Sequence, residues 1–478
     1  MARRQHAAEV RLVSIAAAVV ALLAVASVVL LLAPTDNIED SSVFFKGVEP
    51  VDVMRVLMSN EYGTVDIYFT GEGYLVDDIP AELVDVEELI DLLTHCGKVY
   101  ALRTVASASR NLGSYGLADP AARVEITYAD GSALTLLVGK VESVTGNTYF
   151  SVDGDPAVYL MESERSAGFL LPKKAYVEDL VTPELALSSP LSALLDVTFI
   201  GGQLAEPVTV EAVAAKDPQV ARTAISFGTA THIVRGKGVY ELDQTYGVEM
   251  LGALLGISSY DILGYQFTQE EIMAFGFGRP TMQVEFDLKS GVDGEVEHYA
   301  LALLQKDDAY YMTSNDNGVI YAVQEPAFLH VEYSKLLVRW FLSPMLMDVR
   351  EIELTTGGKD YDFVITGETN AEKQVTCNGE ELDIERFRAL YGLLTGAAHD
   401  GRLLEDVVVE GAPLLRLTYH YLDAQKQPDE MELYPGDARQ VNVRVNGVTE
   451  LAMREMYLVR VQEAVSILWT DDPIETDW

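Results

Sequence analysis

A six-residue element, Tyr115-Gly-Leu-Ala-Asp-Pro120, occurs twice in this sequence and organises the residues around it. It runs into the alternating stretch ARVEITYADG, and its second copy, Phe275-Gly-Phe-Gly-Arg-Pro280, runs into TMQVEFDLKSG. In each copy the glycine suits a turn with positive φ, and the proline suits the start of a strand, where no N–H donor is needed. The alternation that follows predicts a strand with one buried face. We therefore expect two copies of one structural unit.

The elements around the two copies also occur in the same order. Each copy is followed by a strand, a polar turn and a second strand with a tyrosine, at Thr148–Met161 and Tyr310–Val323. Each copy is preceded by a short apolar helix, at Val86–Cys96 and Val248–Ile257. Because chance does not readily produce three elements in one order, we interpret them as an internal repeat.

A third, weaker copy follows the second, and chance similarity stays open as an alternative for it. It begins at Pro413, includes the strands of Gln440–Met453, and is preceded by a helix expected at Leu382–Gly396. A further helix is expected to close each copy, at Lys174–Leu187, Ala327–Leu342 and Ala452–Leu468.

These repeats predict the fold class α+β: three tandem related modules of antiparallel sheet plus helices, preceded by one transmembrane helix. The strands are expected to be antiparallel because the connections between them are too short for parallel crossovers. The expected boundaries are a cytoplasmic N-terminus at 1–11, the transmembrane helix at 12–33, a linker at 34–47, two modules at 48–195 and 196–347, and a divergent module at 348–478.

The first copy resembles the bacterial DUF4340 family of uncharacterised extracytoplasmic domains. The resemblance rests on the YGL-x-DP element, an Asp-Gly turn, an isolated glycine and two hairpin tyrosines, here Tyr115, Gly116, Leu117, Asp119, Pro120, Asp130, Gly131, Gly139, Tyr149 and Tyr159. It covers most of residues 50–330, but the second copy departs from it at Phe277 and Arg279, and the third keeps only Pro413 and the strand pattern. The resemblance implies a single-span membrane protein encoded beside ABC-transporter genes, hence an accessory role, and it supplies no catalytic residues.

The segment Leu12–Ala33 is the basis for the expected anchor. It has 22 residues without a charge, and at about 1.5 Å per residue it is long enough to cross a hydrocarbon core of about 30 Å. Arg3, Arg4 and Arg11 precede it, which by the positive-inside rule predicts a cytoplasmic N-terminus and an extracytoplasmic ectodomain. A cleaved signal peptide is the competing interpretation, although its apolar core is shorter and ends in a cleavage site that this sequence lacks. We expect an uncleaved, single-pass protein of the cell membrane.

The formal net charge of −40, from 74 acidic and 34 basic residues, limits the kinds of partner that the chain can bind. Such a surface repels phosphate backbones, which argues against nucleic acid as a partner. The charge is expected to keep a large ectodomain soluble, with a site for cations or a basic partner as the alternative. The two cysteines, Cys96 and Cys377, are expected as unpaired thiols, with one long-range disulfide as the alternative.

No motif in the sequence indicates catalysis, a cofactor or a metal. The neighbours His95 and Cys96 are expected on a helix, where adjacent side chains diverge. Asp153–Asp155 and Asn315–Gly318 look like fragments of calcium loops, but neither is followed by the glutamate that such a loop needs, and both suit hairpin turns. Gly236–Gly238 lacks the other residues of a phosphate-binding loop. Catalytic, cofactor-binding and metal residues are therefore all predicted as none.

Three hypotheses of function follow. The leading one is a non-catalytic, membrane-anchored extracytoplasmic scaffold or accessory subunit of an envelope complex, with the membrane and an ABC transporter as partners. The alternative is an extracytoplasmic solute- or glycan-binding ectodomain, for which 24 tyrosines, 15 phenylalanines and three tryptophans supply stacking surfaces. An enzyme without a sequence signature is the third, because paired carboxylates are set in space and not in sequence.

Overall fold

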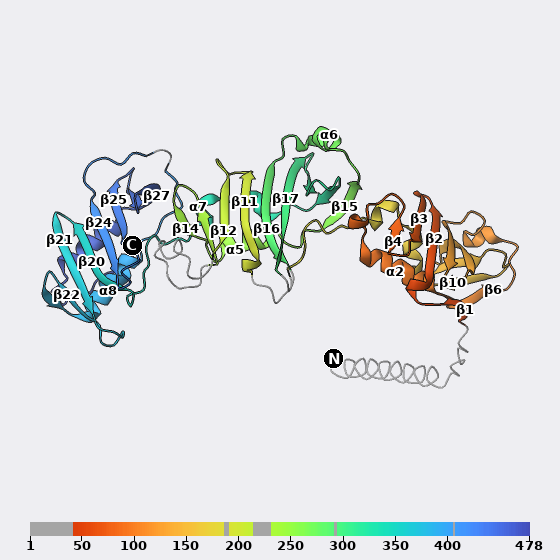
Figure 1. Ribbon diagram of the computed structural model, residues 1–478, viewed down its shortest axis with the longest axis horizontal. Coiled ribbons are helices and arrows are strands. Elements are labelled where there is room, and N and C mark those ends of the chain that lie inside the picture. Colours follow the sequence, from red (N-terminus) through yellow and green to blue (C-terminus); the bar gives the residue numbers. More distant parts are fainter. Residues whose placement is uncertain (1–41, 186–190, 214–230, 291–293, 405–406) are drawn as a thin grey trace, which may run out of the picture. The chain divides into compact units, whose positions relative to one another are not determined.

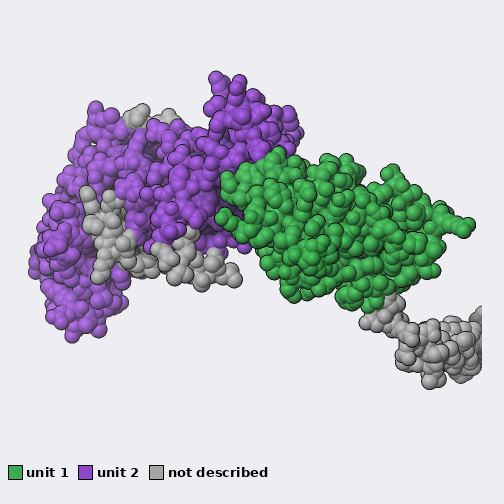
Figure 2. All heavy atoms as spheres, turned by 45° about the vertical axis from the view of Figure 1, so that its right-hand side comes forward, with its two compact units in different colours: residues 1–177 green, residues 178–478 purple. Residues whose placement is uncertain are grey.

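The computed structural model describes residues 42–185, 191–213, 231–290, 294–404 and 407–478 (Figure 1). The chain divides into two compact units, Met1–Val177 and Glu178–Trp478 (Figure 2). Antiparallel pairing forms one two-stranded sheet and three large sheets of eight, nine and eight strands. The first large sheet lies in the first unit, and the second and third lie in the second unit.

The first unit is built around a sheet in the order β4-β3-β2-β7-β8-β9-β10-β6, with β1 and β5 paired separately. The helix α2 packs against β2 and buries Leu92, Leu93 and Cys96. Asp85 caps this helix by accepting a hydrogen bond from the Glu88 N–H at 3.0 Å, which satisfies a donor that a helix start leaves open. The elements are β1 (Val43–Gly47), β2 (Val53–Asn60), β3 (Gly63–Phe69), β4 (Tyr74–Val76), α2 (Val86–Gly97), β5 (Lys98–Ala101), β6 (Arg103–Ala106), β7 (Ala122–Tyr128), β8 (Ala133–Val141), β9 (Thr148–Val152), β10 (Val158–Met161) and α3 (Ser163–Ala167).

The second large sheet follows the order β14-β13-β12-β11-β16-β17-β18-β19-β15. Its helices are short, and α6 begins with a capping box in which Thr268 and Glu271 each satisfy the other's backbone donor. The elements are β11 (Leu194–Gly201), β12 (Val208–Ala212), β13 (His232–Arg235), β14 (Val239–Glu241), α5 (Tyr246–Gly252), β15 (Ser259–Gly264), α6 (Gln269–Ile272), β16 (Met282–Ser290), β17 (Glu295–Lys306), β18 (Ala309–Ser314), β19 (Ile320–Val323) and α7 (Tyr333–Leu336).

The third large sheet follows the order β23-β22-β21-β20-β24-β25-β26-β27. Two helices, α8 and α9, contact each other, and rings of α8 pack on rings of the sheet, as Phe387 does on Phe363 with centroids 5.6 Å apart. The elements are β20 (Val349–Thr356), β21 (Lys359–Thr366), β22 (Gln374–Cys377), β23 (Glu380–Leu382), α8 (Ile384–Thr395), β24 (Leu415–Tyr421), β25 (Asp429–Pro435), β26 (Gln440–Val445), β27 (Val448–Arg454) and α9 (Met456–Ser466).

One strand order occurs in all three large sheets. A run of hairpin-connected strands comes first, a helix follows, and a second run of four strands comes last. In each sheet the first strand of the second run pairs with the first strand of the first run, as β2 with β7, β11 with β16, and β20 with β24. Every second residue of β7 is buried. One face of this sheet therefore covers the core, and the other face carries polar residues.

The expected fold class, α+β with three tandem modules preceded by one transmembrane helix, is wrong. Antiparallel sheets make up most of the described chain, and the helices between them are few and short. Among the described residues, no helix is both long enough and apolar enough to cross a membrane. The expected span at 12–33 lies outside the described residues.

The expected closing helices show the physical reason for the difference. In the part of the predicted helix Lys174–Leu187 that the structure describes, residues 174–185, the helical structure is limited to a turn at Lys173–Tyr176. Ala327–Leu342 contains two short turns, Ala327–His330 and α7, before the chain becomes extended. Extended backbone can pair with the edge of a sheet, whereas a helix satisfies only its own N–H and C=O groups and leaves the edge open. Only the third closing helix forms, as α9.

The turn glycines of the repeated element behave as the sequence predicts. Gly116 ends a helical turn in the left-handed region at φ 73°, and Gly276 has φ 147°. A Cβ on Gly116 would lie 2.8 Å from the backbone nitrogen of Lys140, and a Cβ on Gly276 would lie 2.7 Å from a methyl carbon of Leu304. Both positions therefore require glycine for the backbone angle and for the space, which is a structural role.

A buried carboxylate ties three strands of the third sheet together. The Glu432 side chain is 1% exposed and accepts hydrogen bonds from Arg416 at 2.9 and 2.8 Å, from Arg444, and from the Tyr434 hydroxyl at 3.1 Å. Burial raises the pKa of Glu432, but the hydrogen bonds from the two guanidinium groups outweigh burial and hold this pKa below its ordinary value. The charged form of Glu432 is therefore favoured by folding.

We predict that Glu432→Gln lowers the free energy of unfolding by about 2 kcal/mol, because two guanidinium groups lose a charged acceptor. Since the folded pKa is lowered, the stabilisation by Glu432 is present above the ordinary carboxyl pKa of 4.5 and is lost as pH falls through the folded value. Urea unfolding at several pH values should show that the difference in free energy of unfolding between parent and variant shrinks as pH falls through this range.

Glu430→Gln is the matched control, because its carboxylate is 42% exposed and lies 3.6 Å from Arg416. An exposed pair of this kind contributes about 0.5 kcal/mol or less. Equal destabilisation by the two substitutions would contradict the role of Glu432.

Candidate functional site

An extended segment pairs with the last strand on one edge of the second sheet. This segment, residues 337–341, follows α7 and is named the first connector. The Val338 N–H donates to the Glu241 carbonyl at 2.9 Å, and the Asp243 N–H donates to the Leu336 carbonyl at 2.7 Å. The end of β14 is therefore not an open edge.

A second extended segment, residues 397–404, is named the second connector, and it pairs on both of its sides. The His399 N–H donates to the Arg339 carbonyl of the first connector at 3.0 Å. On the other side, the Leu404 N–H donates to the Glu450 carbonyl of β27 at 2.9 Å. Backbone pairing thus runs from the second sheet through the two connectors to the third sheet, within one compact unit.

A buried carboxylate fastens the same junction. The Glu450 side chain on β27 is 5% exposed and accepts hydrogen bonds from the Tyr240 hydroxyl at 2.9 Å and from the Gly238 N–H at 3.2 Å. Burial, with Glu450 beside it, raises the pKa of Tyr240, so that its hydroxyl stays a donor. The Gly236–Gly238 turn therefore binds an anion through its backbone as a phosphate loop would, but the anion is a side chain of the protein itself.

A hollow lies over the two connectors. It consists of two adjoining cavities of about 200 and 350 Å³, which share the lining residues Arg339, His399, Asp400 and Arg454. Lys335 and Asp243 add charge on one side, and Trp340 adds a ring that is 48% exposed on the other. The name "hollow" is kept below for these two cavities together.

The cations of the hollow differ in how they are paired. Lys335 forms an ion pair with Glu332 at 2.7 Å. Arg339 and Arg454 are exposed, and neither makes an ion pair or a side-chain hydrogen bond with any residue that the structure describes. Two guanidinium groups in one hollow are thus available for an anion from outside.

The carboxylates of the hollow are oriented by the backbone. One oxygen of Asp243 accepts the N–H groups of Thr245 and Tyr246 at 2.9 and 2.8 Å, at the start of α5. Asp400 accepts from the Arg402 N–H at 3.1 Å and from the side-chain amide of Gln440 at 2.5 Å. Fixed carboxylates of this kind can accept further hydrogen bonds from hydroxyl groups.

His399 lines both cavities of the hollow and is 6% exposed. Its Nε2 lies 3.2 Å from the Val338 carbonyl and its Nδ1 accepts the Gly401 N–H at 3.1 Å, an arrangement that suits the neutral ring. Burial lowers the pKa of His399, with Arg339 adding to the effect and the Val338 carbonyl opposing it. The ring is therefore a neutral, fixed spacer and not a proton carrier at neutral pH.

The residues singled out in the sequence have structural roles elsewhere. The His95 ring lies 3.5 Å from Asp91 on the same helix, while Cys96 is fully buried, and burial raises the pKa of its thiol. Cys96 and Cys377 are both free thiols. Burial raises the pKa of Glu88, next to the cap of the same helix, as well.

The two suspected calcium-loop fragments are hairpin turns. Asp155 accepts the Tyr159 hydroxyl at 2.6 Å and the Ala157 N–H at 2.9 Å, and these bonds lower its pKa. In the other turn, Asn317 donates to the Tyr321 hydroxyl at 2.9 Å, and Gly318 has φ 73°. In both hairpins the polar side chains form hydrogen bonds that stabilise the turn.

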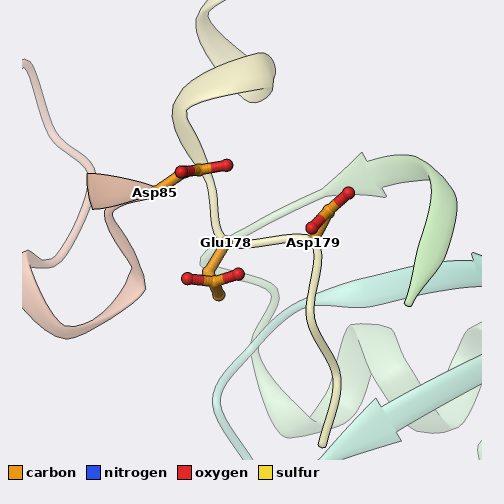
Figure 3. A group of neighbouring side chains, drawn as sticks. All are labelled: Asp85, Glu178 and Asp179. Atoms are coloured by element: carbon orange, nitrogen blue, oxygen red, sulfur yellow. The ribbon is translucent and has the colours of Figure 1, made fainter. Parts of the chain in front are cut away.

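Figure 3 shows three carboxylates, Asp85, Glu178 and Asp179. Asp85 caps α2 in the first unit. Glu178 and Asp179 begin the second unit, where a Glu178 oxygen accepts the Leu180 N–H at 3.1 Å and the Asp179 carbonyl accepts the Ser259 N–H at 2.8 Å. Each residue has a role within its own unit, and a group of acidic side chains does not by itself define a metal site, so we assign none to them.

Comparison with known proteins gives one match. Residues 77–184 match the family model described as Domain of unknown function (DUF4340), and the chain carries a DUF4340 domain over these residues. The match begins just after β4 and is narrower than the resemblance expected over 50–330. No curated protein and no solved structure matches the chain.

Sequence reasoning did not find the hollow. Its residues come from the start of α5, from both connectors, from the end of β27 and from Trp478. No short motif contains them, and the first connector was expected as a helix. The one signal in the sequence was the pair Arg339-Trp340 in a chain poor in both residue types.

We predict that Glu450 and Tyr240 are energetically coupled. Glu450→Gln removes the charge that the Tyr240 hydroxyl faces, and Tyr240→Phe removes that hydroxyl. The coupling free energy from a double-mutant cycle, measured by urea unfolding, should be about 1–2 kcal/mol, as for a buried hydrogen bond to a charged group.

The control cycle combines Glu450→Gln with Tyr246→Phe, whose hydroxyl donates to the His330 carbonyl and not to Glu450. That cycle should show no coupling. Strict additivity in the first cycle would mean that Glu450 does not fasten the junction through Tyr240.

Proposed function

We propose that this protein is a non-catalytic scaffold or accessory subunit of an extracytoplasmic envelope complex, with an ABC transporter as its membrane partner. The observation that carries the proposal is the joining of the second and third sheets through paired connectors into one compact unit. A unit joined by backbone hydrogen bonds keeps its surfaces in fixed relation, which is what a scaffold requires. The resemblance to DUF4340 proteins, and the match over residues 77–184, support an accessory role.

The open faces of the sheets support a role in interaction. On the first large sheet Arg55 forms a two-pronged ion pair with Asp66 at 2.8 and 2.7 Å, and Arg123 pairs with Asp153 at 3.1 Å. Charged side chains fixed in this way cover a sheet face with a defined pattern and lose little further freedom when a partner binds.

We propose no catalytic group, because the hydrogen bonding and burial of the titratable side chains suit structural roles. Backbone N–H groups orient the carboxylates of the hollow, and burial lowers the pKa of His399. Cys96 and Cys377 are buried thiols whose pKa values burial raises. Reactive cysteines and general acids or bases need accessible groups with pKa values adjusted toward neutrality.

A surface thiol can test location and partner together. In the parent chain both cysteines are buried, so a cysteine introduced at the exposed turn residue Glu72 is the one accessible thiol within the described residues. We predict that Glu72→Cys, expressed from its own chromosomal locus, reacts with a membrane-impermeant biotin maleimide in intact cells. Capture of the biotinylated chain in mild detergent should recover a membrane protein in fixed stoichiometry.

The parent chain, treated identically, is the control and should not be captured. Labelling of Glu72→Cys only after cell lysis would contradict the extracytoplasmic location. Capture of the labelled chain alone, at native abundance, would contradict the role as a subunit of a complex.

A second candidate function is solute or glycan binding, and the hollow is the observation that favours it. The hollow combines unpaired guanidinium groups, oriented carboxylates and an exposed indole ring, whereas a purely structural junction needs none of these.

A further inference from the structure

The hollow lacks the strong negative charge of the protein as a whole. Its lining includes three cationic side chains, Lys335, Arg339 and Arg454, and two carboxylates, Asp243 and Asp400. Lys335 is neutralised by its ion pair with Glu332, so the two unpaired arginines balance the two carboxylates. The whole chain has a net charge of −40. Two arginines without an ion pair in such a chain mark a place where one anionic group can be bound.

The two arginines determine which anionic groups the hollow can bind. A guanidinium group presents a planar fork of N–H donors, which matches the oxygens of a carboxylate or a phosphate. With 74 acidic residues in the chain, Arg339 and Arg454 are still without an ion pair among the residues that the structure describes. The Arg339 carbonyl accepts a hydrogen bond from the His399 N–H, which fixes the backbone of Arg339. One of the two guanidinium groups is therefore attached to a segment whose backbone is fixed.

The two carboxylates add acceptors for hydroxyl groups. Thr245 and Tyr246 hold one oxygen of Asp243 by their N–H groups, and the second oxygen has no partner within the described residues. Asp400 also lines the hollow, and each of its two oxygens accepts a hydrogen bond that orients it. A ligand with one anionic group and several hydroxyls would satisfy both kinds of group.

Trp340 supplies a flat apolar surface at the same place. Its backbone is bridged to Ala398 of the second connector, and its side chain is 48% exposed. An indole ring held in this way can pack against the apolar face of a sugar ring, as aromatic rings do against flat partners.

We propose that the hollow binds a sugar acid, that is, a sugar unit with one carboxylate or phosphate group. Arg339 and Arg454 bind the oxyanion, Asp243 and Asp400 accept hydroxyls, and Trp340 packs under the ring. The net charge of −40 repels a long, uniformly charged polymer, so the ligand is a small sugar or one end of a sparsely charged chain. This inference rests on the second candidate function and names its ligand class.

The test is isothermal titration of the full chain with four probes. Digalacturonate carries carboxylates, and galactobiose is its neutral counterpart. Glucose 6-phosphate tests phosphate as the source of the anion, and adenosine monophosphate tests a nucleotide. We expect digalacturonate or glucose 6-phosphate to bind at least about tenfold more tightly than galactobiose, which corresponds to one charge-assisted hydrogen-bond pair.

Arg339→Gln and Arg454→Gln are the test variants, and each should weaken binding of the acidic sugar by about tenfold or more. Both side chains are exposed, so the fold should tolerate the change. Arg279→Gln is the matched control, because Arg279 is also exposed and without an ion pair among the described residues but lies outside the hollow lining. It should leave the affinity unchanged.

The proposal would be overturned if galactobiose bound as tightly as the acidic sugars, or if none of these sugars bound. It would also be overturned if both arginine variants kept the parent affinity, or if adenosine monophosphate bound more tightly than either sugar acid. The comparison of acidic and neutral probes needs no variant. A negative result leaves the capture of a membrane partner through Glu72→Cys unaffected, so failure of this site and failure of the scaffold role are distinguishable.

Discussion

An antiparallel sheet that does not close on itself has two edge strands whose outward N–H and C=O groups need partners. The arrangement of residues 178–478 depends on how this need is met. The first connector pairs with the end of β14, the second connector pairs with β27, and the connectors pair with each other. Two sheet edges that would otherwise attract other chains become the contact that joins the second and third sheets into one unit.

The hollow and its chemistry follow from the same pairing. A connector that pairs through its backbone groups leaves its side chains free either to pack inward or to face solvent. On the first connector, Leu337 and Val338 are buried, whereas Arg339 and Trp340 are exposed in the lining of the hollow. A helix over the same residues, as first expected, would have distributed these side chains around its axis. The candidate site is thus a consequence of how the edges are closed, with Glu450 fixing one side of it through Tyr240.

The sequence predicted best where one local pattern determines the structure. The helix expected at Val86–Cys96 is α2, which ends one residue later, and Asp85 supplies its cap. The glycines of the repeated element have positive φ values because a turn and a close approach leave no room for a side chain at Gly116 or Gly276. Turns rich in Asp, Asn and Gly are likewise decided by neighbours a few residues away.

The sequence predicted poorly where a partner distant in the chain decides. The apolar residues Leu337 and Val338 fit a helix as well as an extended segment, and only the open edge at Glu241 and Asp243 selects the extended form. The buried Glu432 and Glu450 were not distinguishable from the many exposed acidic residues. The arginine partners of Glu432 are placed by strand register, and the tyrosine partner of Glu450 lies on a strand of another sheet. The hollow could not be predicted because its arginines are about 115 positions apart in the sequence and meet only after both connectors are paired.

Hydrogen exchange of the native full-length chain tests the central claim, that paired connectors join the second and third sheets, most directly. The amides of Val338, Phe341 and His399 donate across the connectors at 2.9, 2.9 and 3.0 Å. If the connectors are part of one cooperative unit, these amides exchange as slowly as those of the central strands β16 and β20, because both need the same opening. Exchange of the three amides at the rate of exposed loops, while β16 and β20 stay protected, would contradict the account.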